Sequence, residues 1–367
     1  MKIYNKKVYL ASCSHSPVYK EMIDAIEEYK RDLIEYGNPW ELWMEKVNEA
    51  KKLFASLINA KESEITIHFS VSSALSALLS SFNYSRRNKI ITNDLEFPTS
   101  NYIFLAQRKL GAKIITLKSL NYKVTSDMYK DFIDDTTKLV SSYYVSPLSG
   151  HKQDLKSLVE ISHEKGAEVY IDAYQAIGYI QTDVRKLDID YMTTGASKWL
   201  LGWPGVAFLY IREDLIHQLE PICIGWLSQK NPFEFGAQNL EYLDTADRFQ
   251  SGTWTIPSIY VAIAGLKIIL NENQSVIEEK VKKLAKYAIE LIIEKGLKII
   301  TPIEENERGA IISIKVKNPY KLEKIANKEG IALSSRGSFI RICPHFFNTY
   351  HDIENAINMI YKLKDVD

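Results

Sequence analysis

The sequence predicts an α/β fold, in which a mostly parallel, seven-stranded sheet carries helices on both faces and a smaller C-terminal α+β unit follows. Two observations support this prediction. Short apolar runs rich in β-branched residues alternate with polar or amphipathic stretches, most of them long enough for a crossover helix, which is typical of parallel strands buried on both faces. After about residue 255 the alternation stops and long helical patterns replace it.

The expected sheet follows a helical N-terminal region. Helical periodicity covers about 20–60 and is interrupted near Gly37, Asn38 and Pro39. The connection 193–206 is short and rich in Gly and Pro, so no helix is expected there. The seven runs expected to form strands are 65–69, 89–92, 113–117, 138–144, 168–172, 189–193 and 206–211.

The C-terminal unit begins with a long apolar helix over 256–270. The further elements expected there are a charged helix to about 295, strands at 311–316 and 339–343, and helices at 320–329 and 350–363. The sequence therefore divides into an N-terminal arm (1–20), a large ligand-binding domain (21–255) and a small C-terminal domain (256–367).

Composition narrows the classes of partner. Lys plus Arg and Asp plus Glu are both 46, so the net charge is zero and nothing favours nucleic acid. No apolar run reaches the roughly 18 residues of a membrane-spanning helix, and the N-terminus lacks the apolar region of a signal peptide. We therefore expect neither a nucleic-acid nor a membrane partner.

The cysteines favour a reducing compartment. Cys13, Cys223 and Cys343 are odd in number, far apart, and not in the spacing of metal ligands. The sequence therefore predicts reduced cysteines, a cytoplasmic location and no metal site.

Polar residues gather where the expected strands end. In an open α/β sheet, ligands bind beyond the carboxyl ends of the strands. Several of these polar residues are therefore expected to meet in one crevice. The segments concerned are 70–73, 94–100, Ser146, 172–175 and 193–198.

Asp172 and Lys198 are the two residues whose chemistry is most specific. Alone, Asp172 would be a helix N-cap and Lys198 a solvated lysine. A partly desolvated lysine, however, has a lowered pKa and forms Schiff bases. Pyridoxal phosphate (PLP) needs such a lysine, together with a carboxylate that keeps its ring nitrogen protonated and a donor such as Gln175 to its phenolic oxygen. The three residues together therefore predict a PLP site.

The segment YIDAYQAIGYIQTDVRKLDIDYMTTGASKWLLGWPGVAFLYIRED (170–214) resembles the core of class V aminotransferases. These are fold-type-I PLP enzymes and include kynureninases, cysteine desulfurases and epimerase-like members. The likeness extends from about residue 8 to 355, and its most specific part is Asp-x-x-Gln at 172–175 followed by Ser-Lys-Trp at 197–199.

The resemblance implies further cofactor contacts. Ser72 and Ser73 match the phosphate-binding turn at a helix N-terminus, where hydroxyls and free N–H groups suit an anion. Phe97 matches the aromatic residue that stacks on the cofactor ring, and Ser197 stands where the family often places a phosphate ligand. Without the resemblance, an ordinary N-cap serine would explain Ser72 and Ser73 better, and a core phenylalanine would explain Phe97 equally well.

The resemblance also implies a substrate site and a partner. Arg341, within FIRICPHFFNT (339–349), matches the arginine that clamps the substrate α-carboxylate, with Arg336 as a second candidate, because a planar fork suits that group. His15 falls where the N-terminal segment approaches the substrate.

A homodimer with active sites at the subunit interface is also implied. The segment RFQSGTWT (248–255) resembles a segment that lies near the partner's phosphate in this family. Trp226 and Thr253 are therefore implied to be cofactor contacts. Two-fold dimers are also the commonest oligomers on general grounds.

The expected activity is an aminotransferase that acts on an amino acid by Schiff-base exchange at Lys198. Departures from the family pattern disfavour a cysteine desulfurase, because 330–341 lacks a cysteine and Cys343 is expected only to pack. A kynureninase-like hydrolase and an epimerase or lyase are the alternatives. A non-catalytic PLP-binding protein is disfavoured by the intact set of Lys198, Asp172 and Arg341.

Overall fold

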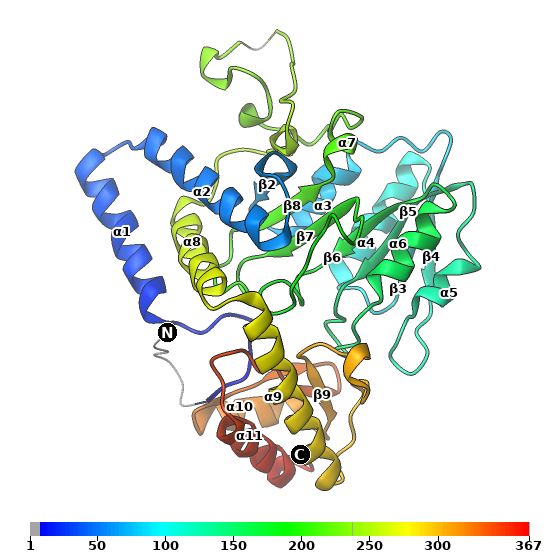
Figure 1. The fold of residues 1–367 in the computed structure, drawn as a ribbon, viewed down its shortest axis with the longest axis vertical. Coiled ribbons are helices and arrows are strands. Elements are labelled where there is room, and N and C mark those ends of the chain that lie inside the picture. The colour runs from blue at the N-terminus through cyan, green and yellow to red at the C-terminus, as the bar shows by residue number, and fades with distance from the viewer. Residues whose placement is uncertain (1–7, 237, 367) are drawn as a thin grey trace.

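The computed structural model describes residues 8–236 and 238–366, and a seven-stranded sheet forms the centre of its larger unit (Figure 1). The strand order is β2-β8-β7-β6-β5-β3-β4. Strand β8 is antiparallel to both of its neighbours, and the remaining pairs are parallel. The predicted mostly parallel sheet is therefore confirmed. Its strands are β2 (Ile65–His68), β3 (Lys89–Asn93), β4 (Lys113–Leu117), β5 (Thr137–Tyr143), β6 (Glu168–Asp172), β7 (Tyr191–Gly195) and β8 (Ala207–Ile211).

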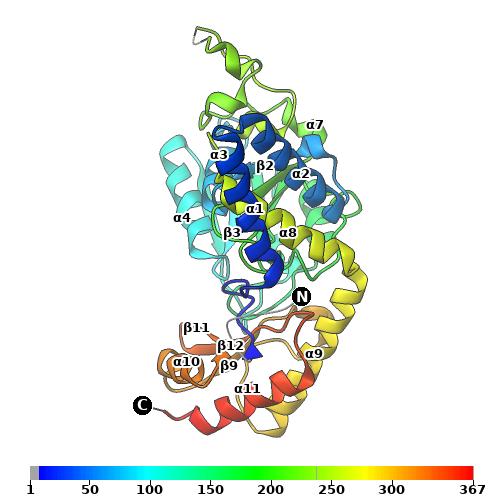
Figure 2. The same cartoon turned by 90° about the vertical axis from the view of Figure 1, so that its left-hand side faces the viewer.

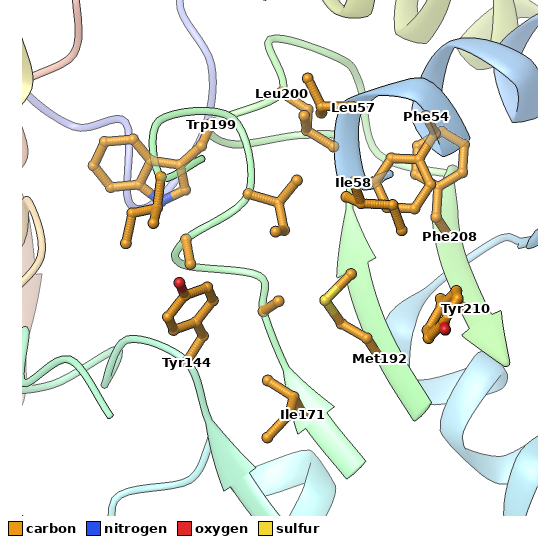
Figure 3. Packing of buried hydrophobic residues seen from close by; sticks show 14 of the residues in the cluster. Phe54, Leu57, Ile58, Tyr144, Ile171, Met192, Trp199, Leu200, Phe208 and Tyr210 are labelled. Atoms are coloured by element: carbon orange, nitrogen blue, oxygen red, sulfur yellow. The ribbon is translucent and has the colours of Figure 1, made fainter. Parts of the chain in front are cut away.

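Helices cover both faces of the sheet. Successive strand residues point to opposite sides, so apolar residues on both faces need helices to bury them. Ile171 and Met192 pack with Phe54 of α2 in one buried cluster (Figure 3), whereas Tyr170 and Tyr191 belong to a second cluster with α3 and α4. The prediction of helices on both faces is confirmed. The helices of this unit are α1 (Lys20–Tyr36), α2 (Trp40–Ile58), α3 (Val71–Leu79), α4 (Pro98–Ala106), α5 (Ser126–Lys130), α6 (Leu155–His163), α7 (Glu213–Ile216) and α8 (Ile256–Asn271).

Helix α8 packs against α1 and α2, and its apolar residues belong to the same cluster as Phe54. This packing favours placing the boundary between the large and small units after α8. No helix within 8–236 or 238–366 is long and apolar enough to cross a membrane.

The smaller unit lies below the large one in Figure 1 and has its own apolar core. A three-stranded antiparallel sheet in the order β11-β12-β9 is packed with helices. The two short strands β10 and β11 escaped the sequence analysis because runs of two or three residues carry no readable periodicity. The elements are α9 (Gln274–Glu294), β9 (Ile312–Lys315), α10 (Pro319–Lys328), β10 (Ile331–Ala332), β11 (Ser334–Arg336), β12 (Phe339–Ile342) and α11 (Tyr350–Leu363).

Residues 8–19, which we call the strap, connect the two units (Figure 2). At the small unit, β1 (Val8–Tyr9) pairs with β10, and the Leu10 amide donates to the Ala332 carbonyl at 2.9 Å. At the large unit, the Ser16 amide donates to the Ser197 carbonyl at 2.8 Å. The strap therefore contacts both units, and its contact with the large unit lies next to Lys198.

A disulfide joins Cys13 of the strap to Cys343 of the small unit, with a Cα–Cα separation of 5.7 Å. Both cysteines are fully buried, and Cys223 is free and exposed. The expectation that all three cysteines are reduced, and that Cys343 only packs, is therefore wrong. The strap and the end of β12 come together only through tertiary contacts between residues 330 positions apart, and cysteine spacing in the sequence does not report such contacts.

Candidate active site

A cavity of about 200 Å³ opens where β6 and β7 end and where α3 and α4 begin. The strand ends thus converge as the sequence analysis expected. Six of the twelve residues proposed from the sequence line this cavity: Ser72, Phe97, Asp172, Gln175, Ser197 and Lys198.

Lys198 lies just after β7, with its amine between two aromatic rings. The Nζ atom is 4.0 Å from the centroid of the Tyr174 ring and 5.8 Å from that of Phe97. Burial lowers the pKa of Lys198 to about 7, with nearby Arg341 and Arg336 acting in the same direction and Asp172 opposing them. A large fraction of this amine is therefore neutral, and nucleophilic, near neutral pH.

Asp172 ends β6 and presents its carboxylate to the same cavity. Its Oδ1 accepts a hydrogen bond from the Tyr174 amide at 3.0 Å. Burial raises the pKa of Asp172, while that hydrogen bond and the charge of Lys198 lower it. Among the described residues no cationic nitrogen lies within ion-pair distance of this carboxylate. A buried carboxylate of this kind is suited to a cationic group of a ligand.

Tyr174 lines the cavity as part of the expected segment 172–175, but the sequence analysis gave it no role of its own. Its ring lies under the Lys198 amine, and its hydroxyl shares a 2.8 Å hydrogen bond with Ser197 Oγ. The ring fits only because residue 195 is glycine, since a Cβ there would lie 2.2 Å from the ring. The position of Tyr174 inside the Asp-x-x-Gln motif was the available signal.

Gln175 is held by two hydrogen bonds of fixed polarity. Its Oε1 accepts from the indole Nε1 of Trp199 at 2.8 Å, and its Nε2 donates to the Cys13 carbonyl at 3.0 Å. An indole N–H only donates and a carbonyl only accepts, so these partners determine which way the amide faces. One N–H of Nε2 remains for a ligand.

The two serines of the expected phosphate turn have different environments. Ser72 lies in the first turn of α3 and lines the cavity. Ser73 does not line it, because its side chain completes a capping box with Ser70 and its hydroxyl donates to the Ser70 carbonyl at 2.8 Å. Thr99 and Ser100, from the first turn of α4, also line the cavity; they belong to the segment 94–100 that was expected there, but no role was predicted for either residue.

Glu96 lies beside Phe97 and is fully enclosed by protein. Ser141 Oγ donates to its Oε1 at 2.9 Å, and its Oε2 has no partner among the described residues. Burial, with a contribution from the negative charge of Asp172, raises the pKa of Glu96 to about 8. Glu96 is therefore a neutral acid at neutral pH, and nothing in the sequence pattern distinguished it from a surface glutamate.

Arg341 lies in β12 and is fully buried. It does not line the cavity itself, because Pro147 separates it from the cavity. It donates to the carbonyl of Pro147, which does line the cavity, at 2.6 Å, and to Ser334 Oγ at 2.6 Å. Its Nε has no partner among the described residues, and burial lowers its pKa to about 9. Arg336, the second candidate, is exposed on β11.

The remaining proposed residues do not line the cavity. His15 lies in the strap, with its Nδ1 2.7 Å from the Ser16 carbonyl oxygen. Trp226 packs against Trp40, with ring centroids 5.7 Å apart, and Thr253 is exposed. A single chain thus does not bring these residues to the cavity, and the contacts of Trp226 and Thr253 across a subunit interface stay predictions.

The family model described as Aminotransferase class-V matches residues 8–357. The chain therefore belongs to the class-V aminotransferase family of PLP-dependent enzymes.

Three known proteins illustrate what the chain is similar to. The uncharacterized aminotransferase YcbU of Bacillus subtilis is 32% identical over 351 residues, covering 96% of this chain and 93% of that protein. A kynureninase of Bacillus thuringiensis subsp. konkukian is 26% identical, covering 93% of this chain and 83% of that protein. The solved structure of a C-DES mutant with glycine covalently linked to its PLP cofactor superposes with a TM-score of 0.89 at 18% identity, covering 97% and 96% of the two chains. That likeness establishes the shared fold.

Proposed function

We propose that this protein is a PLP-dependent aminotransferase that takes an amino acid as substrate and binds its cofactor through Lys198. One observation carries the proposal: a lysine with a lowered pKa and a buried carboxylate, which has no ion-pair partner among the described residues, line the same cavity at the carboxyl edge of the sheet. These are the two groups that PLP chemistry requires of a protein.

The residues around the cavity fit this cofactor. Bound PLP supplies an aldehyde carbon that bonds to amines and a protonated ring that withdraws electrons from the substrate. Asp172 would keep the proton on the ring nitrogen, and Phe97 would cover a ring face. The start of α3, with the Ser72 hydroxyl and the amides of Val71 and Ser72, would bind the phosphate, because the first amides of a helix have no acceptor within it; the Ser73 amide is already used by the Ser70 cap.

Substrate orientation and proton transfer fall to Arg341 and Lys198. Arg341 would bind the α-carboxylate of the substrate, exchanging its bond to the Pro147 carbonyl for a carboxylate oxygen. The absence of an acidic partner around its guanidinium, among the described residues, supports this role. Once displaced from the cofactor, the neutral amine of Lys198 would accept the α-proton of the substrate as general base.

The same residues are compatible with a kynureninase-like hydrolase or with an epimerase or lyase, and the similarity to a kynureninase keeps the hydrolase as the second candidate. A desulfurase is disfavoured on structural grounds. Its chemistry needs a free thiol near the substrate, and Cys343, the cysteine two residues beyond Arg341, is bonded to Cys13.

The test begins with the purified protein and PLP. We expect uptake of the cofactor with a visible absorption band, and loss of that band in Lys198→Ala; exposed Lys118→Ala is the matched control. In single-turnover mixtures, the right amino acid should bleach the band and release one keto acid per site. Failure to take up PLP would refute the proposal. Release of anthranilate and alanine from kynurenine, without bleaching by any amino acid, would favour the hydrolase.

We also propose a cytoplasmic homodimer with active sites at the interface. Residues 221–236 and 238–243 project from the large unit (Figure 1), and Ile222 and Phe235 among them are 80% and 82% exposed. Such apolar exposure supports burial against a second copy. Sedimentation equilibrium should give twice the chain mass, and Phe235→Glu should shift the protein toward monomer. Cell fractionation tests the location.

A further inference from the structure

The amide of Gln175, expected to donate to the phenolic oxygen of PLP, lies at the centre of a hydrogen-bonded group that includes residues without a role so far. Its carbonyl oxygen accepts from Trp199, and its nitrogen donates to the Cys13 carbonyl. With these two bonds formed, the side chain has one N–H left and cannot exchange its oxygen and nitrogen without breaking both. Gln175 also lines the cavity beside Asp172 and Lys198.

Trp199 is itself fixed on several sides. It is fully buried, and its ring centroid lies 4.4 Å from that of Tyr179 (Trp199 is drawn in Figure 3). Its carbonyl accepts from His345 Nε2 at 3.0 Å, and His345 Nδ1 accepts from the Phe346 amide at 2.8 Å. Burial lowers the pKa of His345 to about 4, so this imidazole is neutral and keeps one tautomer. The indole is therefore held by buried packing on its ring and by a hydrogen bond to its backbone carbonyl.

The Cys13 carbonyl is fixed from the other side. The disulfide ties Cys13 to Cys343, and the Cys343 amide donates to the Leu10 carbonyl at 2.8 Å. On the large unit, Ser16 Oγ donates to the Gly202 carbonyl at 2.8 Å. The strap is thus anchored on both sides of residue 13.

We propose that Trp199 and the Cys13 carbonyl form a clamp of positioning groups, which fixes the Gln175 amide so that its remaining N–H donates to the phenolic oxygen of bound PLP. The inference rests on the proposed function for the identity of the ligand. Trp199 does not line the cavity. It acts on the cofactor only through Gln175, and the disulfide acts only by holding the strap.

The test measures the pH midpoint at which the visible band of the lysine-bound cofactor titrates. A hydrogen bond donated to the ring oxygen withdraws negative charge, so this oxygen holds the neighbouring proton less strongly and the midpoint falls. Trp199→Phe keeps an aromatic ring but removes the indole N–H. We expect its midpoint to rise toward that of Gln175→Met, and its PLP dissociation constant to rise about three- to tenfold.

Trp203→Phe is the matched control. The indole of Trp203 donates to Met22 Sδ at 2.9 Å and does not contact the cavity. Its loss should leave both the midpoint and the dissociation constant unchanged. The double variant Trp199→Phe/Gln175→Met should match Gln175→Met alone, since Trp199 acts through Gln175. Independent, additive effects of the two substitutions, or a wild-type midpoint in Trp199→Phe, would overturn the clamp.

A second variant covers the case in which Trp199→Phe does not fold. Cys343→Ser leaves Trp199 intact and frees the strap, so it should shift the midpoint in the same direction by less, while exposed Cys223→Ser should not. An unchanged midpoint in Cys343→Ser would overturn the role of the disulfide. Wild-type protein that takes up no PLP overturns the clamp and the proposed function together. A normal band with an unmoved midpoint in Trp199→Phe overturns the clamp alone.

Discussion

The cavity edge of the large sheet and the junction around Trp199 are built from different kinds of contact. Each functional group at the cavity edge lies at or shortly after the end of the strand that positions it: Asp172 ends β6, and Lys198 follows three residues after β7. The junction instead joins residues far apart in the chain: Cys13 bonds to Cys343, and Trp199 to Gln175 and His345. The cavity edge supplies the groups for the proposed chemistry, and the junction holds them in place.

This difference predicts two kinds of defect. Substitutions at the cavity edge should reduce the chemical step and leave folding nearly intact, because those side chains face a ligand. Substitutions at the junction should reduce stability and cofactor tuning together, because its bonds join the two units. The variants below test that separation, from the largest expected effect to the smallest.

Asp172→Asn should give the largest effect on turnover. The amide cannot keep the ring nitrogen protonated, so we expect kcat to fall by about 100- to 1,000-fold, while the melting temperature changes little. Steady-state kinetics and calorimetry measure the two quantities. Asp94→Asn, at the end of β3 and outside the cavity lining, is the control and should keep full turnover. Equal losses in both variants would contradict the account of the cavity edge.

Cys343→Ser should give the largest effect on stability. The disulfide closes a loop across 330 positions, and removal of a native disulfide costs about 2–5 kcal/mol of unfolding free energy. Denaturant unfolding under non-reducing conditions measures it. Cys223→Ser should change the same free energy by less than about 0.5 kcal/mol. If the two variants were equally stable, the junction would not depend on its covalent bond.

Arg341→Lys sharpens the comparison, because Arg341 belongs to the small unit but would act on the substrate. Loss of the planar fork should raise KM for the amino acid by about 10- to 100-fold with a smaller change in kcat. Arg336→Lys should leave KM unchanged. The reverse result would assign the carboxylate to Arg336.

Glu96→Gln should give the smallest effect, and with the opposite sign. The folded pKa of about 8 exceeds the ordinary 4.5, so the folded state holds a proton that the unfolded state releases. Stability should therefore fall as pH rises from about 4.5 to about 8 and stay flat above. In PLP-free protein the glutamine should remove this slope and stabilise by about 1–2 kcal/mol at pH 8. An unchanged slope, as expected for exposed Glu62→Gln, would show that Glu96 is ionised in the folded state.

The sequence predicted the cavity edge well because its residues follow strands whose apolar runs are easy to recognise. Six proposed residues meet in one cavity, including Lys198 and Asp172. Ser73 was not separated from Ser72, since a capping serine and a cavity serine look alike in sequence. Tyr174 and Glu96 belong to segments expected at the crevice, but their individual roles were missed, because these depend on Gly195 and on burial, respectively.

The junction could not be predicted, because no local pattern reports a tertiary contact. Cysteine spacing suggested reduced thiols, whereas the strap brings Cys13 to Cys343. The strap itself pairs through β1 and β10, each two residues long. Arg341 was found from its motif, but its place behind Pro147 follows from the packing of the two units.

The identity of the lysine that binds the cofactor tests the central claim most directly. Borohydride reduction of the protein loaded with PLP fixes the cofactor covalently, and peptide mass spectrometry then locates it. The account predicts one cofactor per chain, on the peptide that contains Lys198. Modification of a different lysine, or of none, would contradict it.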